Sequence, residues 1–449
     1  MASISTVKTQ APRVPIPEHG ADYRGTVVLA PMVRSGELPS RLLALKYGAD
    51  LVWGPETIDK SLIGCIRRVN PRNGCIEFVR FPSNGGRPDI SSKASVISRI
   101  DTVREKGRMI FQLGTADPDL AVQAARLVAA DVSGIDVNSG CPKPFSTSGG
   151  MGAALLRTPD KLVSILEALV REVGEPFKIG ISVKIRILSD PEMTKSLVSR
   201  LVRTGITGLT VHCRTTPMRP RERAIRDQLR MIADICHEAG VACVMNGDVE
   251  NRDSALKMME EYGVDGAMIA TSAEANSSCF RSEADGGLAP WREVVHEYVK
   301  FCIESENRFG NTKYLLNMLI PGKNKEFGQA KASKTYTDVC RNLKFDDLIP
   351  GAICLDEILQ LSGKWEEAPA EEEKVRSKAI QNAMANNESA RAAGGQGARS
   401  KSISAPSHAG GPIRTLGIPE PSAMKPESDA SVDVSIPATE VVQKHEVAA

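Results

Sequence analysis

The 449-residue chain contains no apolar run approaching the roughly 20 residues that a membrane-spanning helix needs. Its first twenty residues also lack the apolar core of a secretory signal peptide. They carry basic residues and no acid before Glu18. Two interpretations of this segment therefore stay open: a mitochondrial presequence and a short flexible lead. We therefore expect no membrane partner, and a cytoplasmic or nuclear location unless the N-terminus acts as such a presequence.

Cysteine and histidine spacing argues against a metal centre. The chain has ten cysteines, and none of them form a C-x-x-C pair. No cysteine or histidine cluster has the spacing of zinc ligands, so we expect no bound metal. Several cysteines stand inside apolar runs, as Cys213 and Cys243 do, which is typical of reduced structural thiols in an intracellular protein.

The chain also lacks an excess of either charge. It has 57 basic and 55 acidic residues, a formal net charge of +2. Overall charge therefore gives no argument for nucleic-acid binding, and any such argument must rest on a local patch. One such patch is Arg214–Arg230, which carries six arginines against one Glu and one Asp. A second group consists of Arg67, Arg68, Arg72 and Arg80.

Eight short apolar runs, most of them bounded by Gly or Pro, recur along the first 271 residues. This composition is typical of buried parallel strands, whose two faces are both covered. The runs are Thr26–Met32, Ala49–Pro55, Arg108–Gly114, Gly134–Gly140, Gly180–Arg186, Gly208–Arg214, Val241–Gly247 and Gly266–Thr271.

Helical patterns separate most of these runs. They cover Asp119–Ala130, Thr158–Glu172, Pro191–Thr204, Arg226–Ala239 and Asn251–Tyr262, with Thr158 expected as a cap and Pro159 at the first helical position. The alternation predicts an α/β fold, a (β/α)8 TIM barrel. The long interval between the second and third runs includes Cys75–Arg80, for which we expect an extra hairpin.

The strand pattern stops near residue 285. Helical patterns follow at Trp291–Glu304, Thr312–Leu319, Glu326–Asn342 and Leu355–Leu361, and predict a small all-helical domain. After Trp365 the chain has no aromatic residue and no cysteine, a composition typical of disorder. The predicted divisions are a flexible lead at 1–24, a barrel at 25–285, a helical domain at 286–366 and a disordered C-terminal tail at 367–449.

Polar and reactive residues stand at or just after the carboxyl ends of the predicted strands. In a barrel these ends share one rim, and that rim carries the active site. The residues are Met32, Gln112, Asn138, Cys141, Lys184, Arg186, His212, Arg214, Asn246 and Asp248. A random distribution would not place them at matching ends of six strands, so we expect one catalytic rim.

Five rim segments form an ordered set: VVLAPMV at 27–33, VNSGCPKPFSTSGGMGAALL at 137–156, VKIR at 183–186, VHCRT at 211–215 and NGD at 246–248. This set resembles the motifs of tRNA-dihydrouridine synthases, in that family's order. The resemblance spans roughly residues 26–272. The Lys-Pro-Phe-Ser after Cys-Pro and the Arg-Pro-Arg at 219–221 are most similar to the eukaryotic branch that modifies uridine 20.

The resemblance implies a barrel that carries FMN, reduces it with NADPH, and adds hydride to C6 and a proton to C5 of a uracil in tRNA. It implies Cys141 as the proton donor. It implies flavin contacts from Pro31, Met32, Gln112, Lys184, His212, Asn246, Gly247, Asp248, Ala270 and Thr271, and substrate contacts from Asn138, Arg186, Arg214, Arg219 and Arg221. The family usually carries an arginine at the position of Thr271, so this chain departs from the family at the expected phosphate end.

Elementary chemistry agrees with part of this assignment. No side chain can donate hydride, so a cofactor must supply it. A free cysteine is mostly thiol at pH 7 and can therefore donate a proton. A buried lysine such as Lys184 needs an anion or an electron-rich acceptor, which either the flavin or a structural salt bridge supplies.

Two other functions stay open at this stage. One is an FMN barrel oxidoreductase that acts on a small molecule and does not need the arginine patch or the helical domain. The other is a non-catalytic tRNA-binding protein with a degenerate flavin site, a reading that Thr271 favours. We expect tRNA as the partner and a monomeric protein. We also expect the helical domain to contribute to tRNA binding.

Overall fold

The computed structural model describes residues 13–84, 87–88 and 94–361. The tail predicted at 367–449 and the first half of the predicted lead lie outside these residues. The second half of that lead is packed against the barrel, because the backbone N–H of Val14 donates to the carbonyl of Gly240 (2.8 Å) and Tyr23 is buried.

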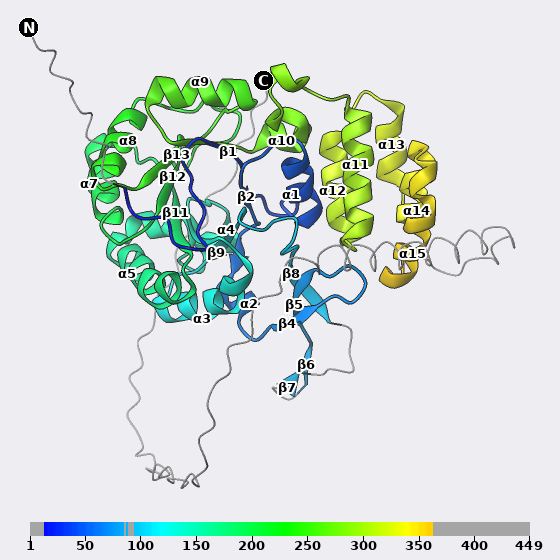
Figure 1. Ribbon diagram of the computed structural model, residues 1–449, viewed down its shortest axis with the longest axis horizontal. Helices are drawn as coiled ribbons and strands as arrows, with labels where there is room; N and C mark the ends of the chain where they lie inside the picture. Colours follow the sequence, from blue (N-terminus) through cyan, green and yellow to red (C-terminus); the bar gives the residue numbers. More distant parts are fainter. Residues whose placement is uncertain (1–12, 85–86, 89–93, 362–449) are drawn as a thin grey trace, which may run out of the picture. The chain divides into compact units, whose positions relative to one another are not determined.

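Eight parallel strands close into the predicted barrel (Figure 1). Every strand lies within one of the eight predicted apolar runs, so the prediction is confirmed. They are β1 (Thr26–Leu29), β2 (Val52–Trp53), β9 (Met109–Gly114), β10 (Gly134–Ser139), β11 (Gly180–Arg186), β12 (Gly208–His212), β13 (Ala242–Asn246) and β14 (Gly266–Ile269). Each pairs with the next, and β14 returns to β1 with Val28 opposite Met268. The short strand β3 (Thr57–Ile58) extends the pairing along β9.

The amino-terminal end of the barrel is filled by an aromatic pair. The rings of Tyr23 and Trp53 lie 5.7 Å apart and are almost fully buried. Glycine is required at position 208 of β12, because a Cβ atom there would come within 2.6 Å of the Tyr23 ring. Apolar packing thus closes the amino-terminal end of the barrel, and the predicted polar site residues stand at the carboxyl-terminal end.

Helices cover the barrel (Figure 1), and each of the five helical patterns predicted between its strands corresponds to one. These helices are α3 (Pro118–Val128), α5 (Pro159–Leu169), α7 (Pro191–Leu201), α8 (Leu229–Glu238) and α9 (Arg252–Tyr262). The helix α1 (Leu38–Lys46) was not predicted. The helix α5 continues through a π-helical turn, Val170–Gly174, into α6 (Glu175–Phe177). Pro159 occupies the first turn as predicted, but the side chain of Thr158 makes no capping hydrogen bond. Side chains of Asp117, Asp190 and Asn251 do cap α3, α7 and α9.

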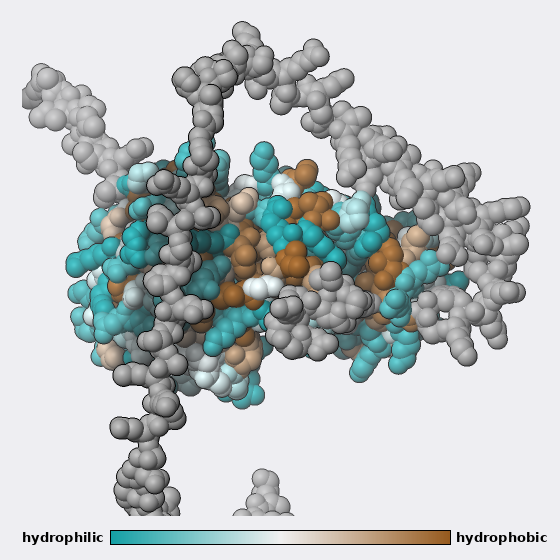
Figure 2. Space-filling model, turned by 90° about the horizontal axis from the view of Figure 1, so that it is seen from below, coloured by the Kyte–Doolittle hydropathy of each residue, from teal (hydrophilic) through white to brown (hydrophobic). Residues whose placement is uncertain are grey.

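The hairpin expected between the second and third runs is part of an antiparallel three-stranded sheet. Its strands are β4 (Ile66–Val69), β5 (Ile76–Arg80) and β8 (Ser95–Ile100), flanked by the short α2 (Asp59–Leu62) and the β6–β7 pair (Ser83–Asn84 and Arg87–Pro88). The expected second arginine patch is largely internally paired here: Arg67 binds Asp131, Arg68 binds Glu77 and Arg72 binds Glu306. Figure 2 shows hydrophilic side chains interspersed with apolar ones on one face of the molecule.

Five longer helices follow the barrel. They are α11 (Trp291–Glu304), α12 (Phe309–Leu319), α13 (Lys325–Ala332), α14 (Tyr336–Leu343) and α15 (Ile349–Leu359). The single helix expected at 326–342 is wrong, because Thr335 and Asp338 form a capping box that starts a new helix. The last helix begins six residues before the expected Leu355. The helices α11 and α12 pack on α1 and on the short α10 (Thr271–Ala275), which lie beside them in Figure 1.

Within the described ranges, no helix combines the length and apolar character that crossing a bilayer demands. A search of the same ranges gives no group of three or more His, Cys, Asp or Glu side chains that could hold a metal ion.

We predict that the ion pair of Arg41 and Glu105 is essential to stability. The Arg41 Nε atom lies 2.6 Å from Glu105 Oε1, and both side chains are at most 2% exposed. Arg41→Met leaves a buried carboxylate unpaired, so the free energy of unfolding should fall by about 3–5 kcal/mol in urea denaturation. The matched control is Arg200→Met, which breaks an exposed pair with Asp160 and should cost at most about 1 kcal/mol. Equal losses in the two variants would contradict the prediction.

Candidate active site

A cavity of about 300 Å³ opens at the carboxyl ends of the barrel strands. Ten of the sixteen predicted site residues line it: Pro31, Met32, Gln112, Asn138, Cys141, Lys184, Arg186, His212, Asn246 and Ala270. They come from segments that are far apart in the chain and that the parallel barrel brings to one rim. The predicted rim therefore exists as one cavity.

The basic side chains of Lys184, Arg186 and His212, from β11 and β12, line this cavity. Among the residues that the structure describes, no carboxylate forms an ion pair with Lys184. The Nζ atom of Lys184 donates to Asn246 Oδ1 (2.9 Å), and Asn246 is fixed by its own bond to the carbonyl of Met268 (2.9 Å). Burial, assisted by the charge of Arg186, lowers the pKa of Lys184 to about 8. Burial and the neighbouring cations lower the pKa of His212 to about 2, so its imidazole is neutral. Such a cavity favours an anionic or electron-rich ligand.

A buried carboxylate below the rim orients the amide of Gln112. Asp136 accepts hydrogen bonds from Gln112 Nε2 and from Ser182 Oγ, both at 2.8 Å. Burial raises the pKa of Asp136 to about 6. Because Asp136 takes one N–H of the amide, the orientation of Gln112 is fixed, and its carbonyl oxygen stays able to accept from a ligand's N–H.

The loop after β10 holds Cys141 in a fixed turn. Asn138 Oδ1 accepts from the backbone N–H groups of Gly140 (3.0 Å) and Cys141 (3.1 Å). The carbonyl of Cys141 accepts from the N–H of Ala153 (2.9 Å). Gly152 has a φ of 57°, and a Cβ atom there would lie 2.6 Å from the Cys141 carbonyl oxygen, so only glycine fits. The short α4 (Pro144–Thr147) follows.

The thiol of Cys141 is held in its protonated form. Burial raises its pKa, and the nearby carboxylate of Glu56 raises it further, while the backbone N–H and the charge of Lys143 act in the opposite direction. Glu56 also lines the cavity and accepts from Ser146 Oγ (2.8 Å). Cys141 can therefore donate a proton at neutral pH and has little thiolate character.

The expected phosphate end is more open. Thr271 is exposed and begins α10, and Ala270 precedes it at the cavity. Asp248, at a φ of 51°, directs its carboxylate to the N–H of Ala224 (2.7 Å) and to the guanidinium of Arg214, and does not line the cavity. Gly247 has a φ of 121° and also does not line it.

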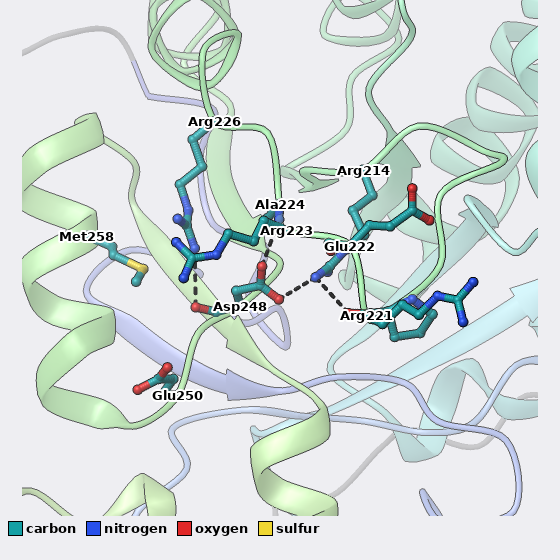
Figure 3. A pocket seen from close by; sticks show the side chains of 10 residues that line it. Arg214, Arg221, Glu222, Arg223, Ala224, Arg226, Asp248, Glu250 and Met258 are labelled. Carbon is teal, nitrogen blue, oxygen red and sulfur yellow. Dashed lines mark hydrogen bonds and ion pairs between the residues drawn. The ribbon is translucent and has the colours of Figure 1, made fainter.

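A second pocket, of about 460 Å³, lies beside the first and is lined by arginines (Figure 3). Arg214 is buried in its wall, where it binds Asp248 and donates to the carbonyls of Glu222 (2.7 Å) and Pro220 (3.1 Å). Its donors are therefore engaged within the protein. Arg221 and Arg223 line the pocket on the exposed side, and across residues 13–84, 87–88 and 94–361 no acidic side chain forms an ion pair with either.

Comparison with known proteins decides the family. The sequence model described as dihydrouridine synthase (Dus) matches residues 28–317. The chain belongs to this family. It is 51% identical over 323 residues to the tRNA-dihydrouridine(20) synthase of Schizosaccharomyces pombe, covering 71% of this chain and 64% of that protein. It is 43% identical over 334 residues to the protein of the same name in Saccharomyces cerevisiae, covering 72% of this chain and 85% of that one. It thus spans less than two thirds of the first relative's length.

The structure of this dihydrouridine synthase family member adds residues that the sequence patterns did not single out. Glu56 follows β2, Asp136 lies inside β10, and Tyr314 reaches the cavity from α12. Glu56 stands at a strand end like the predicted rim residues, and Asp136 is two positions before Asn138 on the same strand face. Both could therefore have been predicted from the strand pattern. The sequence around Tyr314 shows no such pattern. Arg219 and Thr271 line neither pocket, and the roles of all sixteen residues stay predictions.

We predict that alkylation of Cys141 by iodoacetamide is slow at pH 7 and rises with a midpoint above that of a free cysteine peptide. The raised pKa limits the thiolate fraction, which is the reacting species. Glu56→Gln removes a negative charge and should move the midpoint to lower pH. Peptide mass spectrometry of Cys141 measures both curves. A midpoint below that of the free peptide would contradict the assignment.

Proposed function

We propose that this protein is a tRNA-dihydrouridine synthase that reduces uridine 20 of tRNA, with FMN as bound cofactor, NADPH as reductant and Cys141 as proton donor. The observation that carries the proposal is the protonated Cys141 thiol at the cavity that also holds Lys184, Gln112 and His212. The names of the two yeast relatives support the substrate, the position and the use of NAD(P).

The cavity residues fit an isoalloxazine ring. Lys184 is a buried donor whose hydrogen bond goes to the neutral amide of Asn246, and it would bind an electron-rich edge of the ring. The carbonyl of Gln112 would accept from a ring N–H, and Met32 offers an apolar surface at the same cavity. His212 is neutral, and its Nε2 atom accepts from the guanidinium of Arg214 (3.2 Å), so its Nδ1–H is the group left to donate to a ligand. When bound, FMN supplies the hydride that no side chain can provide.

The protein's own residues account for the proton. Cys141 Sγ carries it at neutral pH, and Asn138 fixes the backbone from which the thiol extends. After the proton reaches C5 of the uracil, a thiolate remains at Sγ. Lys184 and Arg186 are close enough for its charge to act on both of their pKa values, so they stabilise that thiolate. Arg186 is itself held by the carbonyls of Gly140 (2.7 Å) and Thr215 (2.9 Å).

The tRNA must present its uracil outside the base stack, which costs on the order of a few kcal/mol. Phosphate contacts offset part of that cost. We assign these contacts to Arg221 and Arg223 beside the cavity, since Arg214 is engaged within the protein. The helices α11 to α15 are the proposed second contact for tRNA.

The test of this function is the visible absorption spectrum of the purified protein, read before and after anaerobic addition of NADPH and then of tRNA lacking dihydrouridine. We expect a yellow protein that NADPH bleaches and tRNA reoxidises. Bleaching without reoxidation by tRNA would instead favour a small-molecule reductase. A colourless protein that FMN does not reconstitute, and that still binds tRNA, would favour the non-catalytic reading.

We predict that Cys141→Ala keeps the yellow colour and is still bleached by NADPH, but that its turnover on tRNA falls by roughly 10²–10⁴-fold. Loss of a positioned acid removes only the proton-transfer step. Stopped-flow absorbance separates flavin reduction from reoxidation by tRNA. Cys65→Ala, at a buried cysteine in the small sheet region, is the control and should keep turnover. Full activity of Cys141→Ala would refute the proton-donor role.

A further inference from the structure

The loop between β1 and α1 is a closed turn at the mouth of the cavity. The N–H of Gly36 donates to the carbonyl of Met32 (2.7 Å), and a Cβ atom at position 36 would lie 2.7 Å from the same oxygen. Two further hydrogen bonds hold the turn in place: Arg41 donates to the carbonyl of Gly36 (3.0 Å), and Ser35 Oγ donates to Glu274. The loop is therefore rigidly built.

This turn holds Arg34 in a strained and exposed position. Its φ is 75°, in the left-handed region that residues other than glycine rarely adopt. Strain of this kind persists where the surrounding structure imposes it, and it concentrates at functional sites. The Arg34 guanidinium lies over the ring of Tyr314, 4.4 Å from its centroid.

Tyr314 belongs to α12 and is the helical region's contribution to the lining of the cavity. The same helix is tied to the loop by Asn311, whose Nδ2 donates to Glu37 Oε1 (3.0 Å). A second aromatic ring, that of Phe145 in α4, lines the cavity and is 44% exposed. Aromatic residues make up only 4% of the chain, so their presence at this mouth is informative.

We propose that Tyr314, backed by Arg34, is a stacking platform for a nucleobase of the RNA substrate at the mouth of the cavity. This rests on the proposed function. Withdrawing the target uracil from its stack leaves its neighbours unstacked, and an aromatic ring with a guanidinium on its face replaces that stacking. A dinucleotide reductant also carries a base that can stack, and the KM values for tRNA and NADPH separate it from RNA, to which we assign the platform.

The test uses the flavin-loaded protein and an unmodified tRNA transcript, with the affinity for tRNA and the KM values for tRNA and NADPH as readouts. Tyr314→Ala should weaken tRNA binding roughly tenfold, as expected for the loss of one base–aromatic stack. The increase in KM for tRNA should exceed the increase for NADPH at least about fivefold. Tyr314→Phe keeps the ring and should restore binding to within about twofold of the wild type.

The variant Arg34→Gly separates an effect on the stability of the protein from an effect on tRNA binding. Glycine adopts a φ of 75° without strain, so this variant should melt no lower than the wild type. It should still bind tRNA more weakly, because the guanidinium is gone. The matched control is Arg200→Gly on α7, which also removes an exposed arginine and should leave tRNA affinity unchanged.

Abasic transcripts identify the stacked base. Removing the base on one side of the target uridine should weaken wild-type binding and abolish the further loss caused by Tyr314→Ala. If the wild type forms no dihydrouridine, the proposed function itself fails. If the wild type is active but Tyr314→Ala binds every transcript as the wild type does, or if only its KM for NADPH rises, the platform is overturned.

Discussion

The buried cluster of Lys184, Arg186 and His212 at the ends of β11 and β12 is the constraint on which the site depends. Burial first, and the repulsion between these basic side chains second, lower the pKa values of Lys184 and His212. The other end of the barrel is closed by the buried rings of Tyr23 and Trp53. The cluster gives the cavity its preference for an electron-rich ligand.

The same cavity keeps a cysteine protonated beside those cations. Burial and Glu56 act on Cys141 in one direction, and Lys143 acts in the other, with the first effect the larger. The site therefore places a protonated thiol near the cations Lys184 and Arg186, which would stabilise the thiolate left by the proposed proton transfer. At the mouth of the cavity, the helical region contributes Tyr314, whose ring lies under the guanidinium of the strained Arg34. The proposed catalytic chemistry thus belongs to the barrel, and the proposed RNA contacts lie where loops and helices border it.

The eight strands were predictable because short Gly- and Pro-bounded apolar runs are a local signal. Because strand ends share a rim, eight of the ten residues picked out at those ends line the cavity. The division near Ser333 was missed because helical periodicity continues across it, and only the capping box of Thr335 marks it. Arg214 looked like a free cation in sequence, but its partner Asp248 is 34 positions away. Tyr314 could not be predicted, since its place at the cavity depends on how α12 packs.

The most direct test of the account is to count the protons exchanged when FMN binds to the flavin-free protein at pH 8, by titration calorimetry in two buffers of different ionisation enthalpy. Burial lowers the pKa of Lys184 to about 8, so part of the population is unprotonated at that pH. An electron-rich ligand beside it raises its pKa, so we predict net proton uptake, which Lys184→Met abolishes. Binding without proton uptake, or uptake that persists in Lys184→Met, would contradict the claim that this cluster is built for the flavin.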